Sequence, residues 1–166
     1  MGHECHKKLG IERLKCAVVT VSDSRTTETD SSGKIIKEYL TKNEHEVMFY
    51  KIVRDDEKEL KDIMNELLSK DIDVMITNGG TGISKRDITI EVVSKFISKE
   101  LVGFGELFRY LSYREIGTPA ILSRAMAGVY KDKLILSVPG SENAVTLAME
   151  KIIIPELGHM LWEIRR

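Results

Sequence analysis

The feature that most constrains this chain is the loop Thr77-Asn78-Gly79-Gly80-Thr81-Gly82, which follows an apolar run at 72–76 and precedes a helix-like segment at 88–96. Its three glycines in four positions leave backbone N–H groups free to surround an anion, and a helix start behind them adds favourable partial charge. The spacing fits neither the P-loop nor the dinucleotide fingerprint, because Lys85 is too late for the first and replaces a glycine of the second. We therefore expect a phosphate-bearing ligand, held in a way that neither pattern describes.

Length and charge restrict the class of protein. The 166 residues, with 42% hydrophobic content, suffice for one domain that buries roughly 68–70% of its unfolded surface. The formal net charge is -1, and no block of five like charges occurs, which argues against nucleic-acid binding. No apolar run is long enough for a membrane helix and the N-terminus is polar, so we expect a cytoplasmic protein without a membrane partner.

The N-terminus differs in composition from the rest of the chain. We expect residues 1–13 to form a flexible tail and residues 14–166 to form a single domain. His3, Cys5 and His6 in this tail resemble a metal-binding tract, although a disordered tail is the favoured interpretation. Cys16 lies in an apolar run, where a small buried thiol is ordinary, and we expect no disulfide.

Hydrophobic periodicity predicts an alternation of strands and helices. The expected elements are strands at 15–21, 47–53 and 72–76, helices at 33–40, 60–68, 88–96, 104–111 and 142–154, and a hairpin of 125–130 with 134–138. Pro155 is expected to open a separate last turn. This order predicts an α/β, three-layer sandwich with a mostly parallel sheet, helices on both faces and the added hairpin.

Polar clusters follow four of the predicted strands at their carboxyl ends. The clusters are Ser22-Asp23-Ser24-Arg25, Arg54-Asp55-Asp56, residues 79–87, and Pro139-Gly140-Ser141-Glu142-Asn143. In an open α/β sheet these ends form one edge, and the ligand crevice lies where the strand order reverses. Four segments far apart in sequence are therefore predicted to meet at one pocket.

Asp55 and Asp87 are the candidate catalytic carboxylates, because each follows a strand end and neither has an evident local partner. If phosphates occupy the glycine-rich loop, two nearby carboxylates would repel them unless a cation lay between, so we expect Asp55 and Asp87 to bind Mg²⁺. The alternative is that both are ordinary turn residues. Asp30 and Asp56 are expected to cap helices, and no serine, histidine and aspartate arrangement supports a hydrolase.

Other polar residues have both a structural and a binding interpretation. Residues 22–24 could hydrogen-bond a ligand or cap a turn. Lys85 and Arg86 could neutralise phosphates or lie in solvent. Glu106 and Arg109 could pair along one helix face or contact a substrate.

Together these residues resemble the MoaB/Mog family of molybdopterin-binding proteins, which make the molybdenum cofactor. The resemblance covers the chain from about Cys16 to Leu157. It rests on ordered segments, namely Thr20-Val21-Ser22-Asp23-Ser24, Asp30-Ser31-Ser32-Gly33, ITNGGTGISKRDIT at 76–89, Gly103-Phe104-Gly105-Glu106, residues 122–128 and residues 137–141. Gly117-Thr118-Pro119 and Pro139-Gly140-Ser141 favour the MoaB branch.

The resemblance implies molybdopterin adenylyltransfer, in which the terminal phosphate of molybdopterin attacks the α-phosphorus of ATP and releases pyrophosphate. The two functional acids of the family fall on Asp55 and Asp87, although the family often has proline where Arg54 stands. Contacts with substrate or nucleotide are then expected from Ser22, Asp23, Ser24, Gly79, Gly80, Thr81, Gly82, Arg86, Glu106, Pro139, Gly140 and Ser141.

The chemistry agrees with this interpretation. A phosphate nucleophile is already largely ionised at neutral pH, so the reaction needs positioning and charge neutralisation by Mg²⁺, backbone donors and cations rather than a base. The alternative is a non-catalytic molybdopterin-binding carrier or a structural oligomer of the same fold. The resemblance also implies a homotrimer or hexamer, with transient contact to other molybdenum cofactor enzymes, and apolar residues around 104–113 and 157–164 are the candidate interface.

Overall fold

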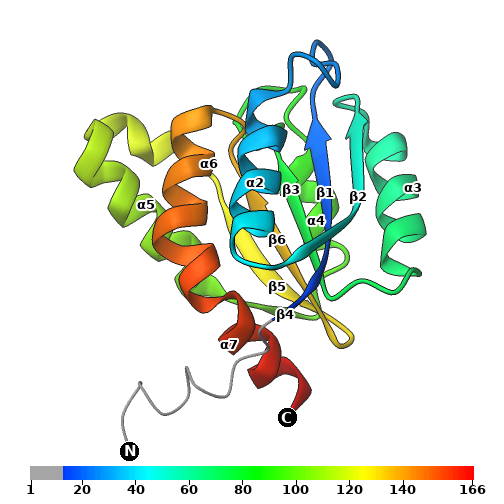
Figure 1. The fold of residues 1–166 in the computed structure, drawn as a ribbon. Helices are drawn as coiled ribbons and strands as arrows, with labels where there is room; N and C mark the ends of the chain where they lie inside the picture. Colours follow the sequence, from blue (N-terminus) through cyan, green and yellow to red (C-terminus); the bar gives the residue numbers. More distant parts are fainter. Residues whose placement is uncertain (1–12) are drawn as a thin grey trace, which may run out of the picture.

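A six-stranded sheet lies at the centre of the protein, and helices cover both of its faces (Figure 1). The computed structural model describes residues 13–166. The predicted α/β three-layer architecture is confirmed. The predicted flexible tail, up to Glu12, and the alternative metal site at His3, Cys5 and His6 lie outside the described residues.

The sheet has the order β2-β1-β3-β6-β5-β4. Its strands are β1 (Lys15–Val21), β2 (Glu46–Val53), β3 (Val74–Asn78), β4 (Lys99–Glu100), β5 (Met126–Tyr130) and β6 (Lys133–Val138). Neighbours from β2 to β6 run parallel, and β5 is antiparallel to both β6 and β4, which confirms the predicted hairpin. Strand β3 begins and ends two residues later than predicted, and the two-residue edge strand β4 was not predicted because neither residue is apolar.

The helices are α2 (Ser31–Lys42), α3 (Glu57–Leu68), α4 (Thr89–Ser94), α5 (Val102–Ile116), α6 (Glu142–Ala148) and α7 (Ile154–Arg165), with a 3₁₀ turn at Thr118–Leu122. A π-helical stretch at Met149–Ile153 joins α6 to α7 directly. The prediction that Pro155 opens a separate last turn is therefore confirmed in part: a last helix begins beside this proline, but it is continuous with α6. Pro155 lies in the first turn of α7, and the wider π turn before it accommodates a residue that has no N–H.

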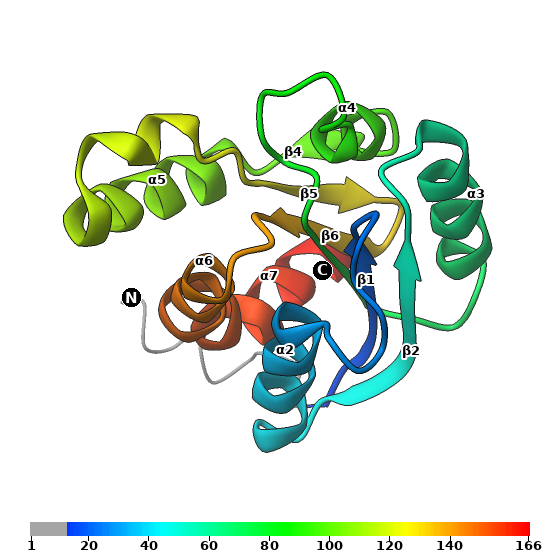
Figure 2. The same ribbon diagram turned by 90° about the horizontal axis from the view of Figure 1, so that it is seen from above.

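Two hydrophobic clusters pack the helices against the sheet, one on each face; Figure 2 shows the helices that lie on the two faces. Alternate side chains of β1 enter the two clusters: Val18 packs with Ile36 of α2 on one face, and Val19 packs with Leu60 of α3 on the other. Strands covered on both faces are continuously apolar, which is why β1 and β3 are almost completely buried. Burial also raises the pKa of the Cys16 thiol to about 12, so this cysteine is unreactive.

The surface of the helices corrects one prediction. The segment 157–164 was expected to contribute to a subunit interface. Its Leu157 and Leu161 are instead completely buried in the core. On α5, by contrast, an apolar row remains open to solvent, made of Leu107, Tyr110, Tyr113 and Ile116 at 44%, 56%, 58% and 52% exposure. No helix among residues 13–166 is long and apolar enough to cross a membrane.

The strand order places a switch point between β1 and β3. The chain leaves β1 towards β2 on one side and returns to β3 on the other, so the loops that follow these strands diverge and leave a crevice between them. Hydrogen bonds fix the first residues of the loops: the Ser22 N–H donates to the Val53 carbonyl at 2.8 Å, and the Gly79 N–H donates to the Val138 carbonyl at 3.1 Å.

Candidate active site

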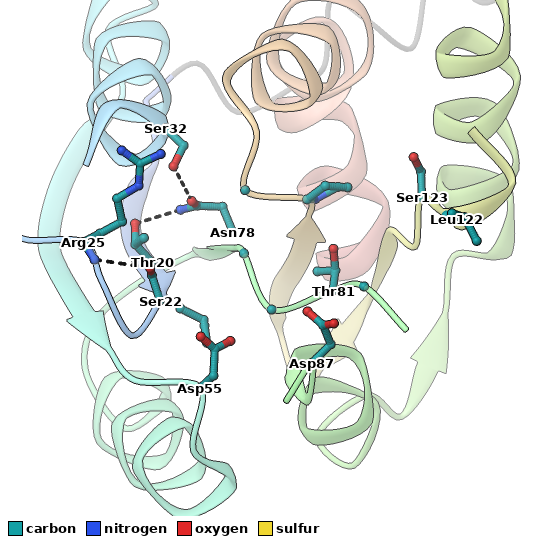
Figure 3. A pocket seen from close by; sticks show the side chains of 16 residues that line it. Thr20, Ser22, Arg25, Ser32, Asp55, Asn78, Thr81, Asp87, Leu122 and Ser123 are labelled. Carbon is teal, nitrogen blue, oxygen red and sulfur yellow. Dashed lines mark hydrogen bonds between the residues drawn. The ribbon is translucent and has the colours of Figure 1, made fainter. Parts of the chain in front are cut away.

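A cavity of about 410 Å³ opens at the carboxyl ends of the parallel strands, and all four predicted polar segments contribute to it (Figure 3). The predicted residues that line it are Ser22, Asp55, Gly79, Gly80, Thr81, Gly82, Asp87, Pro139 and Gly140. Arg25 of the first polar segment and Asn78 of the glycine-rich loop also line it, and sequence reasoning did not assign a further set of lining residues to the site, namely Thr20, Val21, Ser32, Leu122 and Ser123. The predicted convergence of the four segments is therefore confirmed.

Two glycines of the loop are required by its backbone. Gly79 and Gly80 have φ angles of +90° and +60°, in the region that residues with a Cβ rarely adopt. A Cβ on Gly79 would lie 2.3 Å from the Val21 carbonyl oxygen, and one on Gly80 would lie 2.7 Å from Asp55 Oδ1. The loop can pass this close to β1 and to Asp55 because Gly79 and Gly80 have no side chains.

Arg124 braces the rest of this loop from outside the cavity lining. Its Nε donates to the Thr81 carbonyl at 2.8 Å, its Nη2 donates to the Gly82 carbonyl, and its guanidinium pairs with Glu91 of α4. In a trans peptide the C=O and N–H groups point in opposite directions. Holding the two carbonyls therefore turns the following N–H groups away from Arg124.

Asp87 is held by a hydrogen bond within its own loop. Its carboxylate accepts from the Ser84 N–H at 2.9 Å, and the expectation that Asp87 has no local partner is wrong. The hydrogen bond from Ser84 lowers the pKa of Asp87, and the Gly82 N–H and the Arg124 charge act in the same direction. The Ser84-x-x-Asp87 spacing is that of a capping box, in which an acidic side chain reaches back to an N–H three residues earlier, and this signal could have identified the contact.

Asp55 faces the cavity from the loop after β2. The Asp23 N–H donates to Asp55 Oδ2 at 3.2 Å, and the Asp55 N–H donates to Asp23 Oδ1 at 3.3 Å. Burial raises the pKa of Asp55, and the charges of Asp23 and Asp87 raise it further. Asp56 caps α3 through the Glu59 N–H at 2.9 Å, as predicted, so Asp55 is the acid that lines the cavity.

Five predicted binding residues lie outside the cavity lining. Asp23 and Arg86 form an ion pair that links the loops after β1 and β3. Ser24 donates its N–H to Ser22 Oγ at 3.3 Å, within a turn. Ser141 caps α6, and Glu106 is exposed on α5.

A buried carboxylate organises the deep end of the cavity. Asp30 is completely buried; it accepts the Gly33 N–H at 2.9 Å, which confirms the predicted N-cap, and hydroxyl protons from Thr20 and Tyr50 at 2.6 Å each. Burial by itself would raise the pKa of Asp30, but these hydrogen bonds outweigh it and lower the pKa. The role of Tyr50 could not be seen in the sequence, because the contact spans 20 residues.

The two carboxylates that line the cavity, Asp55 and Asp87, are suited to bind Mg²⁺. Among residues 13–166, no three His, Cys, Asp or Glu side chains gather as a protein-only metal site requires. Mg²⁺ is commonly bound by one or two carboxylates together with substrate phosphates and water. Asp55 and Asp87, which line the same cavity and influence each other electrostatically, fit that requirement. The fold and cavity define an α/β protein with a glycine-lined cavity at the switch point of its sheet.

Comparison with known proteins agrees with this class. Residues 17–159 match the family described as "Probable molybdopterin binding domain". "Molybdenum cofactor biosynthesis protein B" of Bacillus cereus is 50% identical over 163 residues, covering 97% of this chain and 96% of the relative. A crystal structure of a molybdenum cofactor biosynthesis protein B has 51% identity and a TM-score of 0.90, covering 93% and 97% of the two chains. The tungsten cofactor synthesizing protein MoaB from Pyrococcus furiosus has 41% identity and a TM-score of 0.86, covering 94% and 99%.

The chain therefore belongs to this molybdopterin-binding family, and its relatives and structural neighbours are MoaB and Mog proteins. The resemblance drawn from the sequence is confirmed.

Proposed function

We propose that this protein acts in molybdenum cofactor biosynthesis, where it binds molybdopterin and transfers AMP from Mg-ATP to the terminal phosphate of molybdopterin. The family and the names of the relatives support the biosynthetic role. The observation that supports the transfer is the pair Asp55 and Asp87, which line one cavity together with the glycine-rich loop.

The reaction forms a bond between a phosphate oxygen of molybdopterin and the α-phosphorus of ATP, and it breaks the bond from that phosphorus to pyrophosphate. The nucleophile carries its negative charge already, so the residues must align two polyanions and exclude water. Backbone N–H groups of the loop are suited to hold phosphate oxygens. Arg86 lies at the rim and can exchange its pairing with Asp23 for a substrate phosphate.

Asp55 and Asp87 are the residues that would hold Mg²⁺, which neutralises the phosphates when bound. Burial and then the nearby charges of Asp23 and Asp87 raise the pKa of Asp55, and a bound cation would offset the repulsion between these carboxylates. Asp87 accepts the Ser84 N–H through Oδ2, and a carboxylate that accepts one hydrogen bond keeps further lone pairs for a cation.

The alternative function is non-catalytic binding of molybdopterin. The observation that favours it is the hydrogen bond of Asp87 to the Ser84 N–H of its own loop, which gives this acid a structural role without catalysis. A carrier would bind molybdopterin and produce no adenylylated product.

The quaternary structure belongs to the same proposal. The exposed apolar row on α5, from Leu107 to Ile116, is a surface that soluble proteins rarely leave open. We propose that it packs against further copies of this chain in a homotrimer or hexamer, within which other enzymes of cofactor synthesis make transient contacts.

One assay tests the transfer. The purified protein is mixed with molybdopterin and Mg-ATP, and adenylylated molybdopterin and pyrophosphate are measured by mass spectrometry and a coupled assay. We expect equal amounts of both products from the parent and strongly reduced amounts from Asp55→Asn. Asp56→Asn is the matched control, because Asp56 caps α3 and asparagine caps equally well. Binding of molybdopterin without product from the parent would establish the carrier instead.

A further inference from the structure

The deep end of the cavity is a floor of three polar side chains, Thr20, Ser32 and Asn78, which Figure 3 shows joined by hydrogen bonds. Thr20 and Ser32 are each 2% exposed and Asn78 is completely buried. Groups so deeply buried must satisfy their hydrogen-bonding capacity internally or through a ligand. The positions of the hydroxyl and amide protons in this floor therefore indicate which kind of ligand the floor can bind.

The short contact of Thr20 fixes the first proton. Thr20 Oγ1 lies 2.6 Å from Asp30 Oδ2, and an ionised carboxylate only accepts, so the Thr20 hydroxyl proton points to Asp30. Thr20 Oγ1 must then accept from Asn78 Nδ2, which lies 2.9 Å away and is also 3.5 Å from the Val19 carbonyl. This places the Asn78 side-chain carbonyl at the opposite end, next to Ser32.

Ser32 has one proton for two acceptors. Its Oγ lies 2.9 Å from Asn78 Oδ1 and 3.0 Å from Asp30 Oδ1. A hydroxyl donates a single proton, so only one of these oxygens receives it, and Ser32 keeps its lone pairs free in either case. Neither neighbour of Ser32 can donate back. The floor therefore has more acceptors than donors, and every hydroxyl proton in it points inward.

We propose that this floor selects a heteroaromatic ring that presents an exocyclic amino group, with Ser32 as the residue that determines the preference. This inference rests on the proposed function, and it identifies the part of the substrate that the floor recognises. The pterin ring of molybdopterin carries an amino group beside a ring N–H, and the adenine of ATP carries an amino group. A ring without this amino group would leave the lone pairs of Ser32 without that donor, and unpaired buried polar groups are costly.

Asp30 maintains the preference without touching the ligand, because it takes the Thr20 proton and competes for that of Ser32. It is a positioning residue. Tyr50 and the Gly33 N–H complete its set of donors, so the carboxylate has little capacity left for a ligand.

Isothermal titration with four probes tests this proposal. The probes are AMP, purine riboside 5′-monophosphate, 6-hydroxymethylpterin and the pterin analogue that lacks the 2-amino group. We expect the parent to bind at least one amino-bearing ring about tenfold more tightly than its amino-free analogue, the size of one buried hydrogen bond with its penalty. A preference within the pterin pair assigns the floor to the pterin, and one within the purine pair assigns it to the nucleotide.

The variants separate Ser32 from its neighbour. In Ser32→Ala the preference should fall to within about twofold, because the acceptor is gone. Ser31→Ala is the matched control: it removes an adjacent buried hydroxyl that has no hydrogen-bond partner and does not line the cavity, so the preference should persist. Equal binding within both pairs by the parent, or a preference that survives Ser32→Ala, would overturn the proposal. Because the adenylyl-transfer assay is separate, its failure counts against the proposed reaction and leaves the ring preference standing.

Discussion

Replacing Asp87 by asparagine is the sharpest test of the site, because it removes one charge and changes little else. The carboxylate accepts the Ser84 N–H at 2.9 Å. The asparagine oxygen can keep this hydrogen bond, but without the negative charge that strengthens it. With one charge-assisted bond weakened at a partly exposed position, we expect the free energy of unfolding to fall by about 1 kcal/mol or less, so the variant folds.

The effect on catalysis should be much larger than the effect on folding. Loss of one preorganised electrostatic group lowers the rate by about 10²–10³-fold, and we expect this reduction in adenylyl transfer for Asp87→Asn and for Asp55→Asn. Single-turnover measurements at saturating Mg-ATP separate the chemical step from binding. Asp56→Asn serves as the control.

Binding of anions without a metal should change in the opposite direction. Asp87→Asn relieves the repulsion between the carboxylate and an incoming phosphate, and it weakens the hydrogen bond from the Ser84 N–H. We expect tighter binding of pyrophosphate in the absence of Mg²⁺, measured by isothermal titration. A parent protein that turns over, together with an Asp87→Asn variant of unchanged rate, would refute the assignment of this acid.

Three further outcomes are expected. Gly79→Ala should reduce the free energy of unfolding, measured by urea titration, by about 3 kcal/mol or more. The reason is that the new Cβ would lie 2.3 Å from a backbone oxygen, at a φ of +90°. Gly103→Ala is the control and should change the free energy of unfolding by less than about 1 kcal/mol, because nothing lies within 4 Å of its Cβ. The pKa of Asp30 is lower in the folded protein than in the unfolded chain, so its stabilisation is complete above about pH 4 and is lost as the pH falls through the lower folded value; urea titrations from pH 7 to pH 3 should show this loss in the parent and not in Asp30→Asn. Light scattering should report an assembly larger than a dimer that Tyr110→Glu, on the exposed face of α5, weakens; a monomeric parent would contradict this.

The fold could be predicted because its signals are local. The apolar run of β1 and the stripe of α3 each follow from residues that are neighbours along the chain, and the caps at Asp30 and Asp56 follow from spacings of three residues. Once a parallel sheet is inferred, its geometry alone brings the carboxyl-end loops together. The convergence of Asp55 and Asp87 required no knowledge of any side-chain contact.

The details that could not be predicted depend on contacts between distant residues. Strand β4 has no strand-like pattern of its own and exists because Lys99 and Glu100 pair with Val129 and Gly128. The exposed position of Glu106 on α5 follows from the packing of that helix, which periodicity did not determine. The hydrogen bond between Tyr50 and Asp30 likewise joins β2 to the start of α2, and no local spacing indicates it.

Arg124 was found by the sequence but not explained by it. It lies in a segment that resembles the family, residues 122–128, and only the structure shows which groups it contacts. Its guanidinium holds the Thr81 and Gly82 carbonyls together with Glu91, a planar arrangement of donors that the single ammonium of lysine cannot reproduce. If the brace sets the direction of the loop N–H groups, Arg124→Lys should keep the positive charge and still weaken pyrophosphate binding by about tenfold, the value of one lost hydrogen bond to a charged ligand. Glu91→Gln should have a smaller effect, because it leaves both carbonyl contacts in place. Equal affinity in the parent and in Arg124→Lys would show that the glycine-rich loop keeps its orientation without Arg124.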